Sequence, residues 1–348
     1  MAKESYRVVQ WTTGQVGSVA IRHFITNPAF DLVGVYVTDP AKVGRDAGEL
    51  AGIAPVGVLA TDDAEAILAL DADCVHFSPL LPDLDMVCRL LASGKSVVTP
   101  LGPWYPTESC RDDFVRIEEA CSAGGSAFHG AGIHPGFAGD VLPLLTTRLV
   151  DRIDRIHVHE VNDHLTNPST YIPLMGFGRD PADLLANPTR PPEVAEMFAQ
   201  SMAFLAEGLG RRLDKVETKL EVATATRDIP YPGGMVEQGT VAGQHYEWTG
   251  WSDGRPFITY HWYWIMGPDH IEPRWDCGDS GYRILIEGEP PLELFLGAPK
   301  PATAERPYVG IPWTAMAGVS AIPAVCKAAP GVVTHFDLGV VLPFGVAR

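Results

Sequence analysis

Near the start of the chain, residue types and spacing suited to holding a pyrophosphate follow a short apolar run. The run Val8–Trp11 leads into Thr12-Thr13-Gly14-Gln15-Val16-Gly17, and apolar residues at helical spacing begin directly afterwards. A strand, a tight turn and a helix set backbone N–H groups and the positive helix end against a phosphate. Thr12 occupies the place of the first of three usual glycines, so an ordinary glycine turn is the alternative. The residues expected to contact the dinucleotide here are Thr13, Gly14, Gln15, Val16 and Gly17.

The loop after the next apolar run bears on which nicotinamide dinucleotide binds. The run Phe30–Val37 ends about twenty residues after the glycine turn, where a dinucleotide fold contacts the adenosine ribose. Thr38 stands where an NAD-selective site usually has an acid, and Lys42 and Arg45 follow as candidate ligands of a 2′-phosphate. In the alternative, Asp39 is the ribose acid and both cations are solvated loop residues. We therefore expect NADP as the cofactor, with NAD as the alternative.

Three residues further along could carry a proton to or from a substrate. Tyr105 and Glu108 follow the apolar run Ser96–Thr99, and His134 lies in a glycine-bounded loop after another apolar run. A phenol or carboxylate near the nicotinamide is a candidate proton carrier, and a loop histidine titrates near neutral pH. The alternative for Glu108 is an acid favoured by the dipole of the following helix. For His134 the alternative is a turn histidine bonded to the backbone.

Aromatic and small residues in the same loops are candidates for the walls of a substrate pocket. Trp104 and Phe137 both fall in loops that follow apolar runs. Between residues 99 and 140 the only cations, Arg111 and Arg116, fall inside a predicted helix, so a neutral carbonyl, imine or amine is the expected substrate. The residues expected to line the pocket are Gly102, Trp104, Phe137, His164 and Tyr171.

These residues need a scaffold that brings strand ends together, and the first 140 residues predict one. Short apolar runs alternate with segments of helical spacing, which indicates a parallel, doubly wound sheet. Ligands of such sheets sit beyond the carboxyl ends of the strands, so Ser78, Pro79, Thr99 and Pro100 are further candidates for cofactor contact. The predicted strands are Tyr6–Trp11, Phe30–Thr38, Cys74–Phe77, Ser96–Thr99 and Ala127–Gly130. The predicted helices are Gln15–Asn27, Asp63–Leu70, Asp83–Ala92 and Glu108–Ala123.

In the second half of the chain the pattern changes to alternation with period two, which is typical of half-buried antiparallel strands. The alternating Tyr260, Trp262 and Trp264 favour sheet core or a dimer interface over a substrate pocket. The predicted strands are Arg152–Glu160, Thr218–Arg227, Gly239–Thr249, Pro256–Met266 and Tyr282–Ile286, and the predicted helices are Pro191–Gly208 and Trp313–Ala328.

The two patterns predict an α/β protein with a clear division. Residues 1–145 are expected to form a dinucleotide-binding domain with a Rossmann-type parallel sheet. Residues 146–310 are expected to form an α+β substrate and dimerisation domain, and residues 311–348 a C-terminal helix that returns to the first domain.

The composition excludes several classes of partner. With a net charge of −17, the chain lacks the basic excess that nucleic-acid phosphates require. No apolar run approaches the length of a membrane span, and residues Met1–Ser5 lack an apolar signal core, so a cytoplasmic protein is expected. The six cysteines include no Cys-x-x-Cys pair, and no His-Glu-x-x-His spacing occurs, so reduced packing thiols and no metal are expected.

Longer motifs resemble a known family. The segment Asp46-Ala-Gly-Glu-Leu-Ala-Gly52 is similar to the one after the second strand of the dihydrodipicolinate reductase N-terminal domain. Together with Pro40–Asp46, Gly132-Ile-His-Pro-Gly-Phe137 and Met175-Gly-Phe-Gly-Arg-Asp180, it resembles the group that contains 2,4-diaminopentanoate dehydrogenase and the native amine dehydrogenases. The resemblance runs from residue 6 to the C-terminal helix. It implies the two-domain fold, use of NAD(P)H and a homodimer formed through the second domain.

Two departures from that family bear on the activity. The dihydrodipicolinate reductases carry a catalytic His-His segment, and this chain has no His-His pair, so lysine biosynthesis is not expected. In the amine dehydrogenase branch a glutamate in the loop after the Ser96–Thr99 strand polarises the carbonyl, and Gly102 aligns with it here. The expected function is transfer of a hydride from NAD(P)H to a ketone or imine carbon of a small, mostly apolar molecule. Plain carbonyl reduction and nucleotide binding without turnover are the alternatives.

Overall fold

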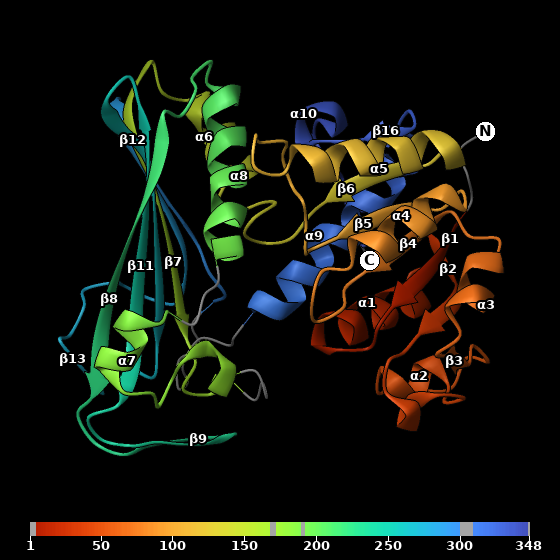
Figure 1. The fold of residues 1–348 in the computed structure, drawn as a ribbon, viewed down its shortest axis with the longest axis horizontal. Helices are drawn as coiled ribbons and strands as arrows, with labels where there is room; N and C mark the ends of the chain where they lie inside the picture. The colour runs from red at the N-terminus through yellow and green to blue at the C-terminus, as the bar shows by residue number, and fades with distance from the viewer. Residues whose placement is uncertain (1–4, 168–171, 189–191, 300–308, 347–348) are drawn as a thin grey trace. The chain divides into compact units, whose positions relative to one another are not determined.

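The computed structural model describes residues 5–167, 172–188, 192–299 and 309–346 and divides the chain into two compact units (Figure 1). Unit 1 contains Met1–Phe137 and Gly310–Arg348, and unit 2 contains Ala138–Val309. The sequence placed the first boundary at residue 145. The structure places it earlier because helix α6 (Val141–Thr147) packs against elements of unit 2.

Unit 1 contains a seven-stranded parallel sheet with the strand order β16-β6-β5-β4-β1-β2-β3, which confirms the predicted doubly wound topology. The order reverses between β1 and β4, and ligands of such sheets bind at this reversal, beyond the carboxyl ends of the strands. The strands are β1 (Tyr6–Trp11), β2 (Phe30–Tyr36), β3 (Ala60–Thr61), β4 (Cys74–Phe77), β5 (Ser96–Thr99), β6 (Ala127–Gly130) and β16 (Gly331–Val332).

The helices of unit 1 begin and end at recognisable caps. Asp63 accepts from two backbone N–H groups at the start of α3, and Gly125, with φ 66°, ends α5. Residues 108–110 form a bend and a turn, so α5 begins at Arg111 rather than at the predicted Glu108. The helices are α1 (Gln15–Thr26), η1 (Pro40–Lys42), α2 (Ala47–Leu50), α3 (Ala64–Ala69), α4 (Leu84–Ala92), α5 (Arg111–Gly124), α9 (Gly310–Val325) and α10 (His335–Leu338).

The C-terminal helix α9 packs against α1 and against strands β4, β5 and β6, which confirms its predicted return to the first domain. Gly318 of α9 lies over the ring of His76, and a Cβ at this position would lie 3.0 Å from His76 Nε2. The glycine therefore allows the helix to approach a buried imidazole in the sheet.

Unit 2 contains a seven-stranded mixed sheet with the order β13-β8-β11-β12-β7-β14-β15. All neighbours are antiparallel except β12 and β7, so the sheet is mixed rather than wholly antiparallel. The strands are β7 (Arg152–Asp163), β8 (Lys215–Ala225), β11 (Val241–Ser252), β12 (Arg255–Ile265), β13 (Ile271–Glu272), β14 (Gly281–Glu289) and β15 (Leu292–Leu296), with a separate hairpin of β9 (Ile229–Tyr231) and β10 (Gly234–Val236). Its helices are α6, η2 (Ile172–Met175), α7 (Pro181–Ala186) and α8 (Pro192–Gly208).

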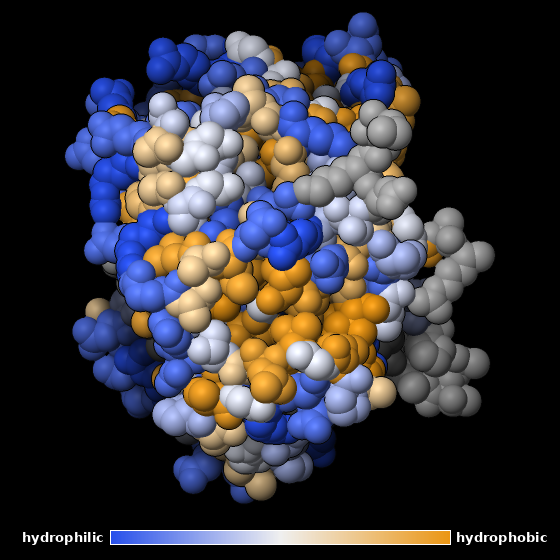
Figure 2. Space-filling view, turned by 90° about the vertical axis from the view of Figure 1, so that its right-hand side faces the viewer, coloured by the Kyte–Doolittle hydropathy of each residue, from blue (hydrophilic) through white to orange (hydrophobic). Residues whose placement is uncertain are grey.

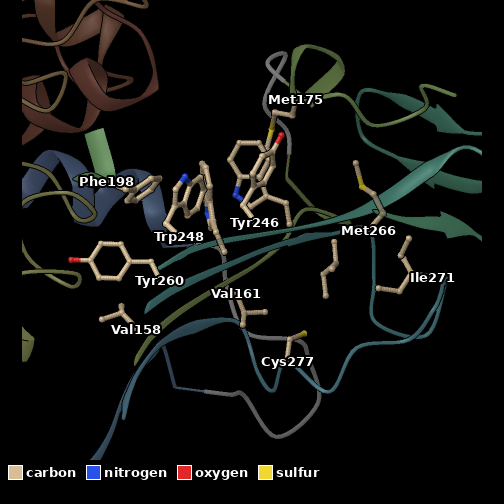
Figure 3. Close-up of a cluster of buried hydrophobic side chains, with 14 of the residues drawn as sticks. Val158, Val161, Met175, Phe198, Tyr246, Trp248, Tyr260, Met266, Ile271 and Cys277 are labelled. Carbon is tan, nitrogen blue, oxygen red and sulfur yellow. The ribbon is translucent and has the colours of Figure 1, made fainter. Parts of the chain in front are cut away.

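The core of unit 2 contains several large aromatic rings, and some of them pack against α8 (Figure 3). The ring of Phe198 on α8 lies 4.5 Å from Trp248 and 5.3 Å from Trp262, centroid to centroid. Tyr260, Trp262 and Trp264 are all buried in this core. The alternating stripe is therefore sheet core, and α8 supplies a covering layer for it without a second copy of the chain.

The surface of the molecule carries some exposed apolar side chains. Figure 2 shows one face on which apolar residues gather in a single area bordered by hydrophilic ones. In unit 1 the most exposed apolar side chains include Leu80, Leu81, Val340 and Leu342. Among the helices that the structure describes, none has the length and apolar character needed to cross a membrane.

Candidate functional site

The turn after β1, the nucleotide loop Thr12–Gly17, has the geometry of a phosphate cradle. Thr12 adopts φ 70°, the left-handed conformation that glycine usually supplies at this place. A Cβ on Gly17 would lie 2.2 Å from the Thr12 carbonyl oxygen, so only glycine lets α1 pack this closely on β1. At Gly14, by contrast, a Cβ would meet nothing within 4 Å. Open space therefore lies in front of the backbone that begins α1, where a pyrophosphate can approach the helix N-terminus.

A buried glutamine that the sequence analysis did not single out holds this loop in place. The side-chain amide of Gln10 donates to the carbonyls of Trp11 and Thr12, both at 3.0 Å, and to Ser78 Oγ at 2.9 Å. Thr12 Oγ1 in turn donates to the Ser78 carbonyl at 2.8 Å. These bonds connect the ends of β1 and β4 and stabilise the positive φ of Thr12. The signal in the sequence was a polar residue inside an otherwise apolar strand.

His76 completes the network from the neighbouring strand. Its Nδ1 lies 2.8 Å from Gln10 Oε1. This amide oxygen can only accept, so Nδ1 is the donor. Complete burial lowers the pKa of His76 to about 4, so its imidazole is neutral with the proton on Nδ1. His76 is therefore a packed, hydrogen-bonded histidine beneath the nucleotide loop.

Lys42 and Arg45, the two candidate ligands of a 2′-phosphate, occupy different environments. Lys42 Nζ donates to Thr13 Oγ1 at 3.1 Å and lies 3.3 Å from the Thr13 carbonyl oxygen, so this lysine contacts the nucleotide loop directly. Arg45 and Thr38 are solvent-exposed. The Asp39 carboxylate accepts from the Ala41 N–H and so caps η1. Lys42 is therefore the cation that the fold holds beside the phosphate-binding turn.

The remaining residues expected to contact the cofactor lie at the strand ends, as predicted from the topology. Ser78 and Pro79 follow β4, and Thr99 and Pro100 stand at the end of β5. Thr99 is buried, and its Oγ1 accepts from the Leu101 N–H at 3.1 Å, which shapes the start of the next loop.

The loop after β5 is tightly packed around a glycine. Gly102 has φ 73°, and a Cβ there would lie 2.4 Å from Cε3 of the Trp104 ring. A Cβ on Gly130 of β6 would lie 2.4 Å from the Pro103 carbonyl oxygen. The ring of Trp104, which is buried, therefore covers Gly102. Any side chain at Gly102 would have to displace this ring and adopt a strained backbone conformation.

The three candidate proton carriers differ in exposure. Tyr105 is 7% exposed, and its ring meets Phe336 of α10 edge-on with centroids 6.1 Å apart. His134 is half-buried in the loop after β6. The side chain of Glu108 is 91% exposed and lies 3.9 Å from Arg111. This favours the alternative in which Glu108 is an acid that interacts with the dipole of the following helix. Tyr105 and His134 are the two shielded groups near the strand ends.

The proposed pocket residues fall into both units. Gly102, Trp104 and Phe137 belong to unit 1, and Phe137 is 37% exposed. His164 is a buried residue of unit 2 whose Nδ1 lies 3.0 Å from Asn167 Nδ2 and whose ring packs edge-on against Trp264. Tyr171 lies outside the described residues. The structure therefore brings Gly102 and Trp104 into contact and places His164 in the core of unit 2.

The cations of the segment that contains these strand ends lie on a helix rather than in the loops. Residues 99–140 are all described, and their two cations, Arg111 and Arg116, lie on α5. Arg116 pairs with Asp85, and Arg111 lies near Glu108. Both guanidinium groups thus have acidic neighbours on the helical surface.

Comparisons with known proteins agree on one group. Residues 137–344 match the family model described as the 2,4-diaminopentanoate dehydrogenase C-terminal domain. An amine dehydrogenase from Streptomyces virginiae is 34% identical over 346 residues, which cover 95% of each chain.

Solved structures show the same fold at lower sequence identity. The amine dehydrogenase from Mycobacterium smegmatis matches with a TM-score of 0.79 at 20% identity, over 97% of each chain. The scyllo-inositol dehydrogenase from Lactobacillus casei, solved with NAD(H) and scyllo-inositol, matches with a TM-score of 0.58 at 13% identity, over 96% of this chain and 93% of that one.

Proposed function

Because the chain belongs to the family of 2,4-diaminopentanoate dehydrogenases and amine dehydrogenases, we propose that it interconverts a small, mostly apolar ketone and the corresponding amine. It is an NAD(P)-dependent oxidoreductase that uses a nicotinamide cofactor, and its proposed substrate is a small-molecule amine or the corresponding ketone. In the reductive direction the carbonyl carbon and ammonia form an imine with loss of water. The imine carbon then gains a hydride and the nitrogen gains a proton.

The observation that carries this proposal is the nucleotide loop. Open space in front of Gly14, the close packing at Gly17 and the network of Gln10 and Ser78 fit a dinucleotide pyrophosphate at the start of α1. The bound nicotinamide supplies the hydride, and the protein must orient the substrate and exclude water.

For the proton we propose His134, with Tyr105 as its neighbour in the site. Both follow strands that end at the same edge of the parallel sheet, and both side chains are shielded from solvent, unlike that of Glu108. His134→Gln and Tyr105→Phe should lower kcat, whereas Glu108→Gln should leave it unchanged. Loss of activity in Glu108→Gln alone would assign the proton to that carboxylate.

Plain carbonyl reduction is the second candidate, and Gly102 favours it. The glutamate that polarises the carbonyl in the amine dehydrogenase branch has no equivalent here, and the Trp104 ring occupies the space beside Gly102. Gly102→Glu is therefore a strained variant. The ammonia dependence of the native protein distinguishes amine formation from carbonyl reduction better than this variant does.

For the cofactor we propose NADP, with NAD as the alternative. Lys42 is held beside Thr13, and the exposed Arg45 follows it on the same loop, so both can reach a 2′-phosphate. Thr38 offers a hydroxyl where an NAD site usually has an acid.

The test is a steady-state assay on the full-length protein. NADPH and NADH oxidation are measured with a panel of small ketones and aldehydes, with and without ammonium at pH 8 to 9. Ammonium-dependent oxidation supports the amine assignment, and ammonium-independent oxidation supports carbonyl reduction. Cofactor binding without oxidation over the whole panel and without amine oxidation in reverse would contradict both.

We also propose a homodimer formed through unit 2, as the family resemblance implies. The covering of the aromatic stripe by α8 leaves the opposite face of the sheet as the surface for such contact. Light scattering at micromolar concentration should give the mass of two chains, and a mass of one chain would contradict the proposal.

A further inference from the structure

The face of the unit 2 sheet opposite α8 carries an unusual group of histidines. Side chains alternate between faces along a strand, so the residues between the buried aromatic ones point the other way. On β12 this places His261 between Tyr260 and Trp262 but on the opposite face. Strand register places Glu247 of β11 and His159 of β7 directly beside it. The histidine face is defined here by His157, His159, His245 and His261.

Three of these imidazoles and two carboxylates form a line across five strands. His245 Nδ1 lies 3.6 Å from Glu221 Oε2, and His245 Nε2 lies 3.3 Å from His261 Nδ1. His261 Nε2 lies 3.2 Å from His157 Nδ1, and His157 Nε2 lies 3.2 Å from Glu287 Oε1. Every ring nitrogen in the line therefore faces another nitrogen or a carboxylate oxygen.

The line has one proton fewer than it needs. It contains four contacts between neighbouring polar atoms, here called junctions, and each is attractive only if one proton or one cation lies between the two atoms. Three neutral imidazoles supply three protons. A cation at the junction between His245 and His261 satisfies all four, because each imidazole then directs its N–H away from the ion, toward Glu221, His157 or Glu287.

We propose that His245, Glu247 and His261 bind one divalent transition-metal ion of the class that Zn²⁺ represents. His245 Nε2 and His261 Nδ1 are 3.3 Å apart, and Glu247 Oε2 lies 3.6 Å from His261 Nδ1. Two nitrogen ligands of a tetrahedral zinc ion, with Zn–N distances near 2.0–2.1 Å, lie about 3.3 Å apart. Two imidazoles and one carboxylate leave a fourth position for water, and this donor set suits zinc.

The surroundings support these ligands. The other ring nitrogen of each ligating histidine faces a second group: Glu221 for His245 and His157 for His261. Such outer partners fix the tautomer and orientation of metal-binding imidazoles.

The charged groups around the site include more than the ligands. Lys219 on β8 donates to Glu221, which offsets the lysine charge. Arg155 on β7 donates to the neutral Thr259 hydroxyl and keeps its positive charge near His157 and His261. A second trio, His157, His159 and His261, has ligand atoms within the same range. The rings of His159 and His261, however, are stacked 4.3 Å apart at 13°. Rings that overlap face to face at this distance cannot both direct a lone pair at one ion. His245 and His261 are also nearly parallel, at 21°, but their centroids are 5.6 Å apart and their nitrogens meet at 3.3 Å, so the carboxylate-containing trio is the better site.

The spacing rules that led to the expectation of no metal did not cover this arrangement. His245 and Glu247 are two apart on one strand, and His261 comes from the neighbouring strand. Only the hairpin register brings the three together.

The experiment uses the full-length protein after removal of metals by a chelator. Zinc binding is measured by competition with a chromophoric chelator, and Co²⁺ is added as a spectroscopic probe. We expect one zinc ion per chain and the visible absorption of tetrahedral Co²⁺. Absence of zinc binding, octahedral Co²⁺ spectra, or half an ion per chain shared between two copies would each overturn the proposal.

Variants locate the ion. His245→Gln and Glu247→Gln should weaken zinc binding by more than about 100-fold, and Glu221→Gln, an outer partner, by about 10- to 100-fold. His159→Gln is the matched control on the same face and should leave zinc binding unchanged. A larger loss in His159→Gln than in Glu247→Gln would overturn the assignment. Far-UV circular dichroism of each metal-free variant checks folding, and the cobalt spectrum of the native protein stands independently of the variants.

Discussion

The two units place polar residues in opposite ways. In unit 1 the residues of the candidate site follow strands, so the nucleotide loop is one continuous segment whose role can be derived from its spacing. In unit 2 the histidine face is built from the middle of strands, namely the hairpin of β11 and β12 and the strand β7 from an earlier part of the chain. Parallel sheets collect loops at one edge, whereas an open mixed sheet collects side chains on a face. The first arrangement is visible in the sequence and the second requires the strand register.

The two units also differ in the kind of residue on which their packing depends. Unit 1 depends on close backbone approach at Gly17 and Gly102, and unit 2 depends on large buried rings such as Trp248. Substitutions at open positions of the nucleotide loop, such as Gly14, should act first on ligand binding, and those in the core of unit 2 on stability.

The largest effect is expected at the nucleotide loop. Gly14→Val should fold, since a Cβ there meets nothing within 4 Å, but its side chain would fill the space for the pyrophosphate and abolish cofactor binding. Fluorescence titration with NADPH measures the affinity, and circular dichroism checks the fold. Gly17→Val is the contrast: its Cβ would lie 2.2 Å from a carbonyl oxygen, so unit 1 should fail to fold. A folded Gly14→Val with native affinity would remove the dinucleotide assignment.

In unit 2 the matching change is Trp248→Ala. It empties space beside Phe198 and should lower the free energy of unfolding by about 3–5 kcal/mol. Urea denaturation measures the loss, with Trp275→Ala, which is only partly buried, as the milder control. Equal losses in both variants would show that the α8 side of the sheet is not the main core.

Acid should destabilise the protein through His76. Its pKa is about 4 in the folded state and 6.5 in the unfolded chain, so the unfolded state binds the additional proton between these values. The stability present above pH 6.5 is therefore lost as the pH falls toward 4, by about 3 kcal/mol for this residue. Urea denaturation at several pH values should give a shallower pH slope for His76→Gln than for the native protein. An unchanged slope would show that His76 is already protonated when folded.

Gln10→Leu should affect both stability and binding in unit 1. It leaves His76 Nδ1 and Ser78 Oγ without their partner and removes the bonds that hold Thr12, at a cost of about 1–3 kcal/mol. The cofactor KM should rise with little change in kcat. Ser18→Ala, which removes only a bond to the Thr13 carbonyl, is the control and should leave the cofactor KM close to the native value. A kcat loss without a KM change in Gln10→Leu would argue against a role in loop geometry.

The smallest effects concern the 2′-phosphate. Arg45→Ala should weaken NADPH binding by about tenfold and leave NADH binding unchanged. The Arg45 side chain is exposed, whereas Lys42 is the residue that supports Thr13 of the nucleotide loop. Lys42→Ala should weaken both cofactors, since Lys42 also supports Thr13. Isothermal titration with both dinucleotides separates the two. Equal losses for NADH and NADPH in Arg45→Ala would point to NAD as the natural cofactor.

Local patterns were sufficient for most of unit 1. The strands at Tyr6–Trp11, Cys74–Phe77, Ser96–Thr99 and Ala127–Gly130 occur as predicted, because short apolar runs between helices have few other ways to bury their side chains. The two-residue strands β3 and β16 were not predicted, since pairing with neighbours rather than sequence defines them.

Only part of the candidate site could be predicted from local sequence patterns. Gly14, Gly17 and Lys42 were named from spacing, and the structure shows open space at Gly14, close helix packing at Gly17 and a hydrogen bond from Lys42 to Thr13. Gln10 was passed over because a polar residue inside a strand looks like an exception to the pattern until its four partners are known. His164 was expected to line the substrate pocket, and the structure buries it beside Trp264.

The sequence by itself determined the alternation of strands and helices in unit 1, the glycine turn at the start of α1 and the shift to period-two strands in unit 2. These follow from local rules, because backbone conformation and side-chain periodicity depend on neighbouring residues. Only the tertiary structure decided that α8 covers the aromatic stripe, that Trp104 closes over Gly102, and that His245, Glu247 and His261 meet on one face. The first depends on packing between distant segments, the second on how the loop after β5 packs, and the third on strand register, and local sequence specifies none of these.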